Sequence, residues 1–427
     1  MTRPRASRLS VVDEMFLRTH RGYGTPVVMQ GVWRGGDVDP AELVQVHEAL
    51  ARGPLSHTVV RPGVPGARPR RRPGAEPWPV EWASQPIDRD ATVEWADDVA
   101  SRNVDPTQGA GWRIAAARLR GGGTVVSLVC SHVITDAHGL AAILAAAMSG
   151  TALPPAPDPA HPFLDDVHDA VRMITVVGAR TLRAVAGLAL HPSRRAELRS
   201  APVRAFGSQS YQKRAQVPET LIVDVDAERW DTEAARTGGT PNSLLVAVVA
   251  AIAGRHDTAV QVSVPVSRRT AANGGSNEID MTELTVRPTD TPAVTRTLLR
   301  EAYLRPPMSS PAGFPPELLQ LVPDRIAHRL APDPGERDVL CSNIGTIPAG
   351  LADLGGASAD AIAARAVHPG IDPRQLAASA NRLSAYLCRL GDRYTLSLVS
   401  KDRGLRARTT AVLAAHGITA HGWDDPA

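Results

Sequence analysis

The chain has 427 residues, of which 43% are hydrophobic and 21% are charged, and this is the composition of a folded globular protein. Its length suits two domains of ordinary size, each with a core of its own. The 47 Lys and Arg residues nearly balance the 44 Asp and Glu residues, for a formal net charge of +3. We therefore expect no nucleic-acid partner, because the whole chain carries no strong positive field.

Cysteine usage and the first residues favour the cytoplasm. Cys130, Cys341 and Cys388 are odd in number and have no paired spacing, which argues against a disulfide framework and against a zinc ribbon. Residues 1–14 contain arginines and an acidic pair but no apolar segment of the length found in signal peptides. We expect a cytoplasmic protein without a metal site.

The first half of the chain predicts an α/β unit. Asp39, Pro40 and Glu42 are a helix start, with a capping residue, a proline in the first turn and an acid behind it. Residues 61–74 carry five arginines among Pro and Gly and no acid; we favour a solvated loop there over a docking site for a phosphate group. The expected strands are 27–33, 112–119 and 124–130, and the expected helices are 41–51, 92–102 and 139–148.

A proline-rich break at 154–159 precedes an amphipathic helical stretch at 164–190. That stretch can lie on a membrane or pack across two lobes, and we favour packing. It is interrupted by Arg172, Arg180 and Arg183, and the apolar run 244–253 is too short to cross a bilayer, so no transmembrane helix is predicted.

The second half also mixes strands and helices. Its expected strands are 221–225, 259–266, 281–286 and 338–343 with a hairpin at 383–400, and its expected helices are 241–253, 316–330 and 405–416. The irregular order of elements predicts mixed α/β lobes in place of a doubly wound sheet. We expect an N-terminal lobe at 1–163, a helical crossover and linker at 164–218, and a C-terminal lobe at 219–427.

The segment 130–139 carries the candidate chemistry. His132 follows a predicted strand, and a histidine held there can take a proton from an alcohol or amine that attacks an acyl carbonyl. Asp136 stands four residues later, and we expect it to hold the loop by pairing with an arginine elsewhere and so to orient His132. Taken alone, this spacing is weak, because a structural histidine is the more frequent explanation.

Several segments agree with one family in order and spacing. Residues 9–17 resemble an opening Leu-Ser-x-x-Asp-x-x-Phe signature, and 131–137 resemble a His-His-x-x-x-Asp-Gly motif. Later blocks at 240–243, 264–268, 277–282 and 342–345 are similar to further family blocks. The chain thus resembles the wax ester synthase/diacylglycerol acyltransferase branch of the condensation-domain-like acyltransferases, which are relatives of chloramphenicol acetyltransferase.

The resemblance implies an α/β fold of two chloramphenicol-acetyltransferase-like lobes, a pseudo-dimer with a tunnel between them. An acyl thioester of coenzyme A or of a carrier protein would enter from one face and the acceptor from the other. His132 would be the base in a direct transfer, without an acyl-enzyme, metal or bound cofactor. The implied catalytic residues are His132 and Asp136, and the implied substrate-binding residues are Ser131, Gly139, Ser342 and Asn343, although the last two fit a turn equally well.

Two departures from the motif keep alternatives open. Ser131 stands in place of the first His, and Ala137 stands in place of the Gly, with Gly139 two places later. We favour an ester-forming enzyme with a hydroxyl acceptor, in specialised-metabolite or lipid biosynthesis. The alternatives are an amide-forming enzyme with an amine acceptor and a non-catalytic protein that binds a thioester.

Other chemistry at the same segment is less favoured. We do not favour Cys130 as a nucleophile, because a buried cysteine usually serves as a small apolar residue. We also do not favour a metal site of His132, Asp136 and His138, because three ligands so close in sequence need not converge. Asn242 is read as part of a helix cap. Membrane contact is considered but not favoured.

Overall fold

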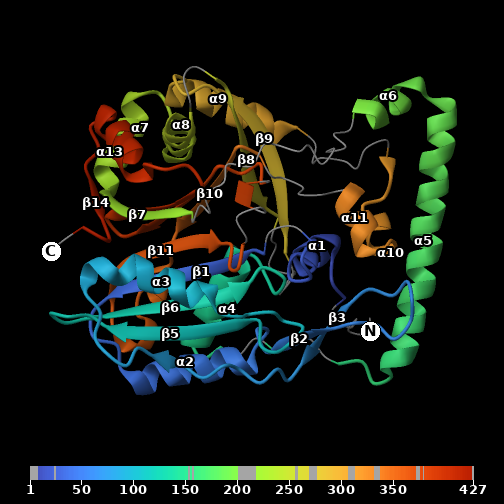
Figure 1. Ribbon diagram of the computed structural model, residues 1–427, viewed down its shortest axis with the longest axis horizontal. Helices are drawn as coiled ribbons and strands as arrows, with labels where there is room; N and C mark the ends of the chain where they lie inside the picture. The colour runs from blue at the N-terminus through green and yellow to red at the C-terminus, as the bar shows by residue number, and fades with distance from the viewer. Residues whose placement is uncertain are drawn as a thin grey trace.

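The structure, a computed structural model, describes residues 8–23, 26–151, 154–155, 158–200, 218–254, 258–268, 277–305, 313–330, 337–371, 376–377 and 379–425. Two mixed β-sheets with flanking helices form two lobes (Figure 1). This is the α/β architecture that the resemblance implies.

Among the described residues, the sheet of the first lobe has five strands in the order β11-β1-β6-β5-β4. These strands are β1 (Val28–Gly35), β4 (Glu81–Trp82), β5 (Trp112–Arg118), β6 (Thr124–Ser131) and β11 (Ala359–Val367). The helices of this lobe are α1 (Val11–Thr19), α2 (Pro40–Arg52), α3 (Thr92–Ser101) and α4 (Ala137–Met148). Apolar residues of α2 and α4 share one buried cluster with the sheet, whereas those of α3 belong to others. The expected hairpin of β5 and β6 is confirmed, and it ends at Ser131.

The sheet of the second lobe has seven strands in the part of the chain that the structure describes, in the order β14-β7-β13-β12-β10-β8-β9. Its strands are β7 (Glu219–Asp226), β8 (Val260–Ser267), β9 (Ile279–Val286), β10 (Val339–Thr346), β12 (Leu383–Leu390), β13 (Arg393–Ser400) and β14 (Ala420–Gly422). Its helices are α7 (Ala227–Arg236), α8 (Pro241–Ala253), α9 (Pro292–Leu304) and α13 (Leu405–Ala415). Helix α8 is buried along most of its length in the largest apolar cluster, as its all-apolar sequence predicts.

No single point in the sequence separates the strands of the first sheet from those of the second. Strand β11 comes from the second half of the sequence but pairs in antiparallel with β1, from Val28 opposite Val367 to Gly35 opposite Ala359. The sequence analysis did not predict this strand, and the expected C-terminal lobe at 219–427 therefore gives one strand to the sheet of the first lobe. The expected boundaries near residues 163 and 219 remain predictions.

The arginine-rich stretch 61–74 is not a solvated loop throughout, and that expectation was wrong. Strand β2 (His57–Val60) pairs with β3 (Arg70–Pro73). Arg70 and Arg71 are buried, and acids that are distant in sequence neutralise them and Arg68. The ion pairs are Arg68 with Asp169, Arg70 with Asp158, and Arg71 with Asp13.

In the sequence, α5 (Pro162–Leu190) and α6 (Pro192–Ser200) come between the strands β6 and β7 of the two lobes. Figure 1 shows α5 along one edge of the molecule, with α10 (Leu318–Leu321) and α11 (Asp324–Leu330) on its inner side. The single helix expected at 316–330 is thus two short ones, because Pro323 cannot continue a helix. By length and composition alone, α5 is long and apolar enough to cross a membrane, but ion pairs of Asp165 and Asp166 with Arg8 attach its start to the first lobe.

Candidate active site

Helix α1 contains most of the opening Leu-Ser-x-x-Asp-x-x-Phe signature, and its residues contact the candidate site. Ser10 caps the helix by accepting from the backbone N–H of Asp13 at 3.1 Å, and the Asp13 carboxylate accepts from the Ser10 N–H at 2.9 Å. Asp13 is fully buried, and Arg71 of β3 neutralises it at 3.0 Å. Arg71 also donates to the carbonyls of Val133 and Ile134, at 3.2 and 3.4 Å. One arginine therefore holds both α1 and the turn that contains His132.

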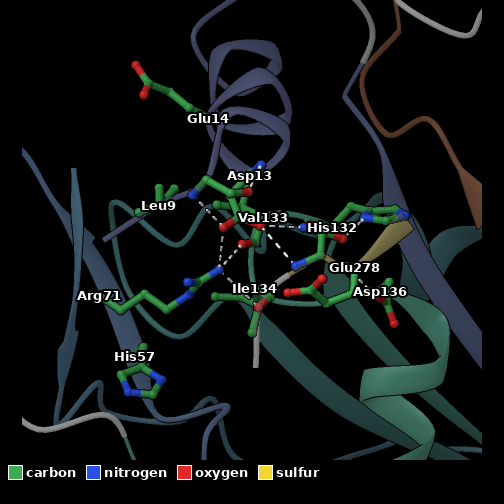
Figure 2. Close-up of polar contacts among 12 residues, drawn as sticks. Leu9, Asp13, Glu14, His57, Arg71, His132, Val133, Ile134, Asp136 and Glu278 are labelled. Carbon is green, nitrogen blue, oxygen red and sulfur yellow. Dashed lines mark hydrogen bonds and ion pairs between the residues drawn. The ribbon is translucent and has the colours of Figure 1, made fainter. Parts of the chain in front are cut away.

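His132 lies in the turn immediately after β6. Its backbone N–H donates to the Val27 carbonyl at 3.3 Å, so the turn is attached to the residue that precedes β1. The side chain is half-buried and points toward the second lobe, where the segment before β9 reaches it (Figure 2). The strand end therefore presents the imidazole at the junction of the two lobes.

Asn277, two residues before β9, joins the two lobes at this point. Its Oδ1 lies 2.8 Å from His132 Nδ1. Its Nδ2 donates to Asp13 Oδ1 and to the His132 carbonyl, both at 2.7 Å, and its backbone N–H donates to Asp13 Oδ1 at 3.2 Å. The chain of contacts thus runs from Arg71 through Asp13 and Asn277 to the imidazole.

These contacts determine which nitrogen of His132 carries the proton. A carboxylate and a carbonyl only accept hydrogen bonds, so the group of Asn277 that faces them is the amide NH₂. The amide oxygen then faces Nδ1, which must donate. The other nitrogen, Nε2, is left with its lone pair, and no hydrogen-bond partner for it is found in the part of the chain that the structure describes. The imidazole is therefore the tautomer that can accept a proton at Nε2.

Two further features act on the ring. Phe16 of α1 stacks on it, with ring centroids 4.1 Å apart and an interplanar angle of 18°. Burial lowers the pKa of His132, and the opposing effects of hydrogen bonds to its own backbone and to Asn277 are smaller. The charges of Asp136 and Asp13 also act to raise this pKa. The net shift is downward, so the ring is neutral at neutral pH and able to act as a base.

Asp136 acts on the backbone of both lobes. Its carboxylate caps α4 by accepting from the Gly139 N–H at 2.8 Å, and its second oxygen accepts from the Glu278 N–H at 2.9 Å. Arg71 lies beside Asp13, and the expected pairing of Asp136 with an arginine stays a prediction. Asp136 thus holds the residue next to Asn277, and so acts on His132 through the chain.

Ser131 and Gly139 lie close to His132 in sequence but have local partners. The Ser131 hydroxyl is buried, lies 2.9 Å from His20 Nε2 and accepts from the Val133 N–H at 3.3 Å. Gly139 supplies the N–H that Asp136 caps. These contacts shape the turn, and substrate binding by either residue stays a prediction.

Ser342 and Asn343 are half-buried on β10 of the second lobe. Asn343 accepts from the Gly345 N–H at 2.9 Å and donates to Asn242 Oδ1 at 3.4 Å, and Asn242 in turn donates to the Tyr303 hydroxyl at 3.1 Å. These hydrogen bonds join β10 to α8 and α9, and none of them reaches His132. A role of Ser342 and Asn343 toward substrate stays a prediction.

The rival chemistries find little support. Cys130 is buried in the apolar cluster of the first lobe, and burial raises the pKa of its thiol, which disfavours a thiolate nucleophile. His138 is exposed on the first turn of α4. Among the described residues, no group of three His, Cys, Asp or Glu side chains is arranged to hold a metal ion.

Sequence reasoning did not assign a role to Asp13, Phe16, Arg71 or Asn277. Three of these residues lie in blocks that carried the family resemblance, 9–17 and 277–282, and this was the signal that could have found them. Arg71 had no such signal, because it stood within a run of arginines. Only the fold brings the four residues to His132.

Comparison with solved structures found chains of similar fold. No protein-family model and no curated protein matches the sequence. The first condensation domain of the CDA synthetase superposes with a TM-score of 0.57 and 18% identity, over 100% of both chains. The chain has the condensation-domain fold.

Two further structures share this fold. The starter condensation domain of rhizomide synthetase, solved in complex with C8-CoA and Leu-SNAC, gives a TM-score of 0.55 and 15% identity over 96% of this chain and 93% of that chain. Polyketide synthase associated protein 5 from Mycobacterium tuberculosis gives 0.56 and 11% over 97% and 98%. At these identities the likeness is one of fold, and the wax ester synthase branch stays a prediction.

Proposed function

We propose that the protein is an acyltransferase that moves an acyl group from a coenzyme A or carrier-protein thioester to a small-molecule acceptor, with His132 as the general base. The observation that carries the proposal is the 2.8 Å contact of His132 Nδ1 with Asn277 Oδ1, because it leaves Nε2, which has no hydrogen-bond partner among the described residues, to accept a proton. A neutral imidazole at a strand end between two lobes is suited to deprotonate a nucleophile as it attacks a carbonyl.

In this mechanism the acceptor hydroxyl gives its proton to Nε2 as its oxygen bonds to the thioester carbon. The tetrahedral intermediate then collapses, the C–S bond breaks, and the proton passes to the leaving thiolate. The products are an ester and a free thiol. We propose a hydroxyl acceptor in specialised-metabolite or lipid biosynthesis, and an amine acceptor would react by the same steps to give an amide. No metal or bound cofactor takes part in these steps.

The buried ion pair of Asp13 and Arg71 supports this role, because it fixes the amide of Asn277 before substrate arrives. Preorganised partners of this kind keep the proton acceptor in the productive orientation and so lower the cost of reaching the transition state. Asn277 and Asp13 are proposed as positioning residues, since they act through His132.

The test is a panel of acyl-coenzyme A and acyl-carrier thioesters with mixed alcohols and amines, in which free thiol and product mass are measured. His132→Ala should lower the acceptor-dependent rate by about a hundredfold or more, since a positioned base contributes that much. His138→Ala is the matched control, because it removes an exposed histidine six positions away and should leave the rate unchanged. Equal turnover in wild type and His132→Ala would refute the general-base role. A folded wild-type protein that binds thioesters without turnover would favour the alternative of a non-catalytic, thioester-binding protein.

A further inference from the structure

Among the residues that the structure describes, only one face of helix α5 packs against the rest of the protein. Ala170, Met173, Val177 and Ala184 recur at helical spacing and are buried, and Asp169 beside them pairs with Arg68 of the first lobe. Packing across the lobes, which the sequence analysis favoured, therefore explains the inner face of the helix. It does not explain the outer face.

The outer face is apolar and exposed. Leu164, Val171 and Leu182 are separated by seven and eleven positions, close to whole numbers of turns, so they lie along one line of the helix. Their exposed fractions are 62%, 57% and 72%, and Val185 on the same side is 51% exposed. Together with Phe163 and Ile174 at its edge, this line is an apolar stripe on a helix about 40 Å long.

Beyond Asp169, the charged residues around the stripe are all positive. Between Asp169 and Glu197 the sequence has no acid and five arginines, which are Arg172, Arg180, Arg183, Arg194 and Arg195. Arg180 pairs with Glu317, the residue that precedes α10. The other four have no carboxylate partner among the side chains that the structure describes, and they are exposed. A partner for this surface should be both apolar and anionic.

We propose that α5 and the start of α6 bind the surface of an anionic lipid bilayer. The apolar stripe would enter the acyl boundary, and Arg172, Arg183 and Arg195 would contact lipid phosphates. A transmembrane orientation is disfavoured because it would remove Asp165, Asp166 and Asp169 from the arginines that bind them. The helix therefore lies in the plane of the interface. The proposal does not depend on catalysis by His132.

The experiment is co-sedimentation of the full chain with vesicles of phosphatidylcholine containing about one third phosphatidylglycerol, compared with phosphatidylcholine alone. Wild type should pellet with the anionic vesicles and be released by added salt, since screening weakens the arginine contacts. The double variant Val171→Asp with Leu182→Asp should weaken binding by about tenfold or more. Val44→Asp is its matched control. It changes a 40% exposed valine on α2, and this variant should bind the vesicles as wild type does.

A second pair of variants separates charge from apolar contact. Arg172→Gln with Arg183→Gln should weaken binding to anionic vesicles by about tenfold. Arg52→Gln with Arg120→Gln removes two exposed arginines elsewhere and should have little effect. Each variant is checked for an unchanged melting temperature. Equal pelleting with both vesicle types, no pelleting with either, or a dimer in sedimentation that Val171→Asp with Leu182→Asp dissociates would overturn the proposal, the last because a second copy would then cover the stripe.

Discussion

The two ring nitrogens of His132 have different surroundings, and this difference gives the residue its chemistry. Nδ1 is held by Asn277, while Nε2 has no recorded partner in the described residues. Burial is the largest influence on the pKa of the imidazole, and it acts against the charged form. The consequence can be measured in the dependence of activity on pH.

We expect the acid limb of kcat/KM to lie below pH 6.5, the ordinary value for histidine. Only the neutral ring can accept a proton, so activity is retained above the lowered pKa and is lost as the pH falls through it. The measurement is a pH–rate profile of kcat/KM for the acceptor, obtained from thiol release with the acceptor well below its KM. A limb at or above the ordinary value would show that burial does not control this group.

Asn277→Ala provides the control for this profile. Its hydrogen bond acts to raise the pKa of His132, so removing it should move the acid limb to still lower pH. The loss of the group that orients the ring should also lower the rate by about ten- to a hundredfold, because a misplacement of about 1 Å can cost that much. A lower rate with an unmoved limb would point to a general loss of structure.

At the scale of the element, one side chain caps a helix and joins two lobes. Asp136 ends the turn after β6, starts α4, and accepts from the Glu278 N–H of the segment that carries Asn277. A sequence pattern can find the cap, because an acid before an apolar helix is a local signal. It cannot find the second contact, which comes from a residue 142 positions away.

Asp136→Ala should therefore cost both stability and activity. We expect a loss of about 2 kcal/mol, because two backbone N–H groups lose a buried charged acceptor, and a rate at least tenfold lower. Asp39→Ala is the comparison, since exposed Asp39 caps α2 through the Ala41 N–H alone. It should cost about 1 kcal/mol and leave the rate unchanged. Denaturant unfolding and thiol release measure the two effects, and equal effects of the two variants would contradict the bridging role of Asp136.

At the scale of the whole molecule, the lobes are joined by β11 and by a buried ion pair. Arg34 of β1 lies 3.2 Å from Asp224 of β7 and 4.2 Å from the ring of Trp423. Both side chains of the pair are almost fully buried, and burial lowers the pKa of Arg34 to about 10. The guanidinium remains charged at neutral pH, so its removal leaves a buried carboxylate less compensated.

Arg34→Ala should lower the free energy of unfolding by about 3 kcal/mol. Arg393→Ala is the matched control, because Arg393 binds the same carboxylate at 3.3 Å but its side chain is 41% exposed. Its loss should cost less than about 1 kcal/mol. Chemical denaturation of wild type and the two variants measures these free energies. An equally small loss of stability in both variants would mean that the ion pair of Arg34 and Asp224 does not stabilise the junction of the lobes.

Local signals in the sequence determined much of this protein. The start of α2, the hairpin of β5 and β6, the buried helix α8 and the place of His132 at a strand end follow from caps, alternation and apolar runs, which depend on near neighbours. The condensation-domain-like fold followed from the order of the blocks. These features need no knowledge of distant residues.

Only the tertiary structure decided which distant groups meet. Strand β11 joins the first sheet, Arg71 pairs with Asp13, and Asn277 reaches His132 from the other lobe. A buried charge needs a partner, but the sequence does not say which of many acids and arginines will lie beside it. The tautomer of His132 is set by that long-range packing, and so the chemistry of the candidate site could be read only from the folded chain.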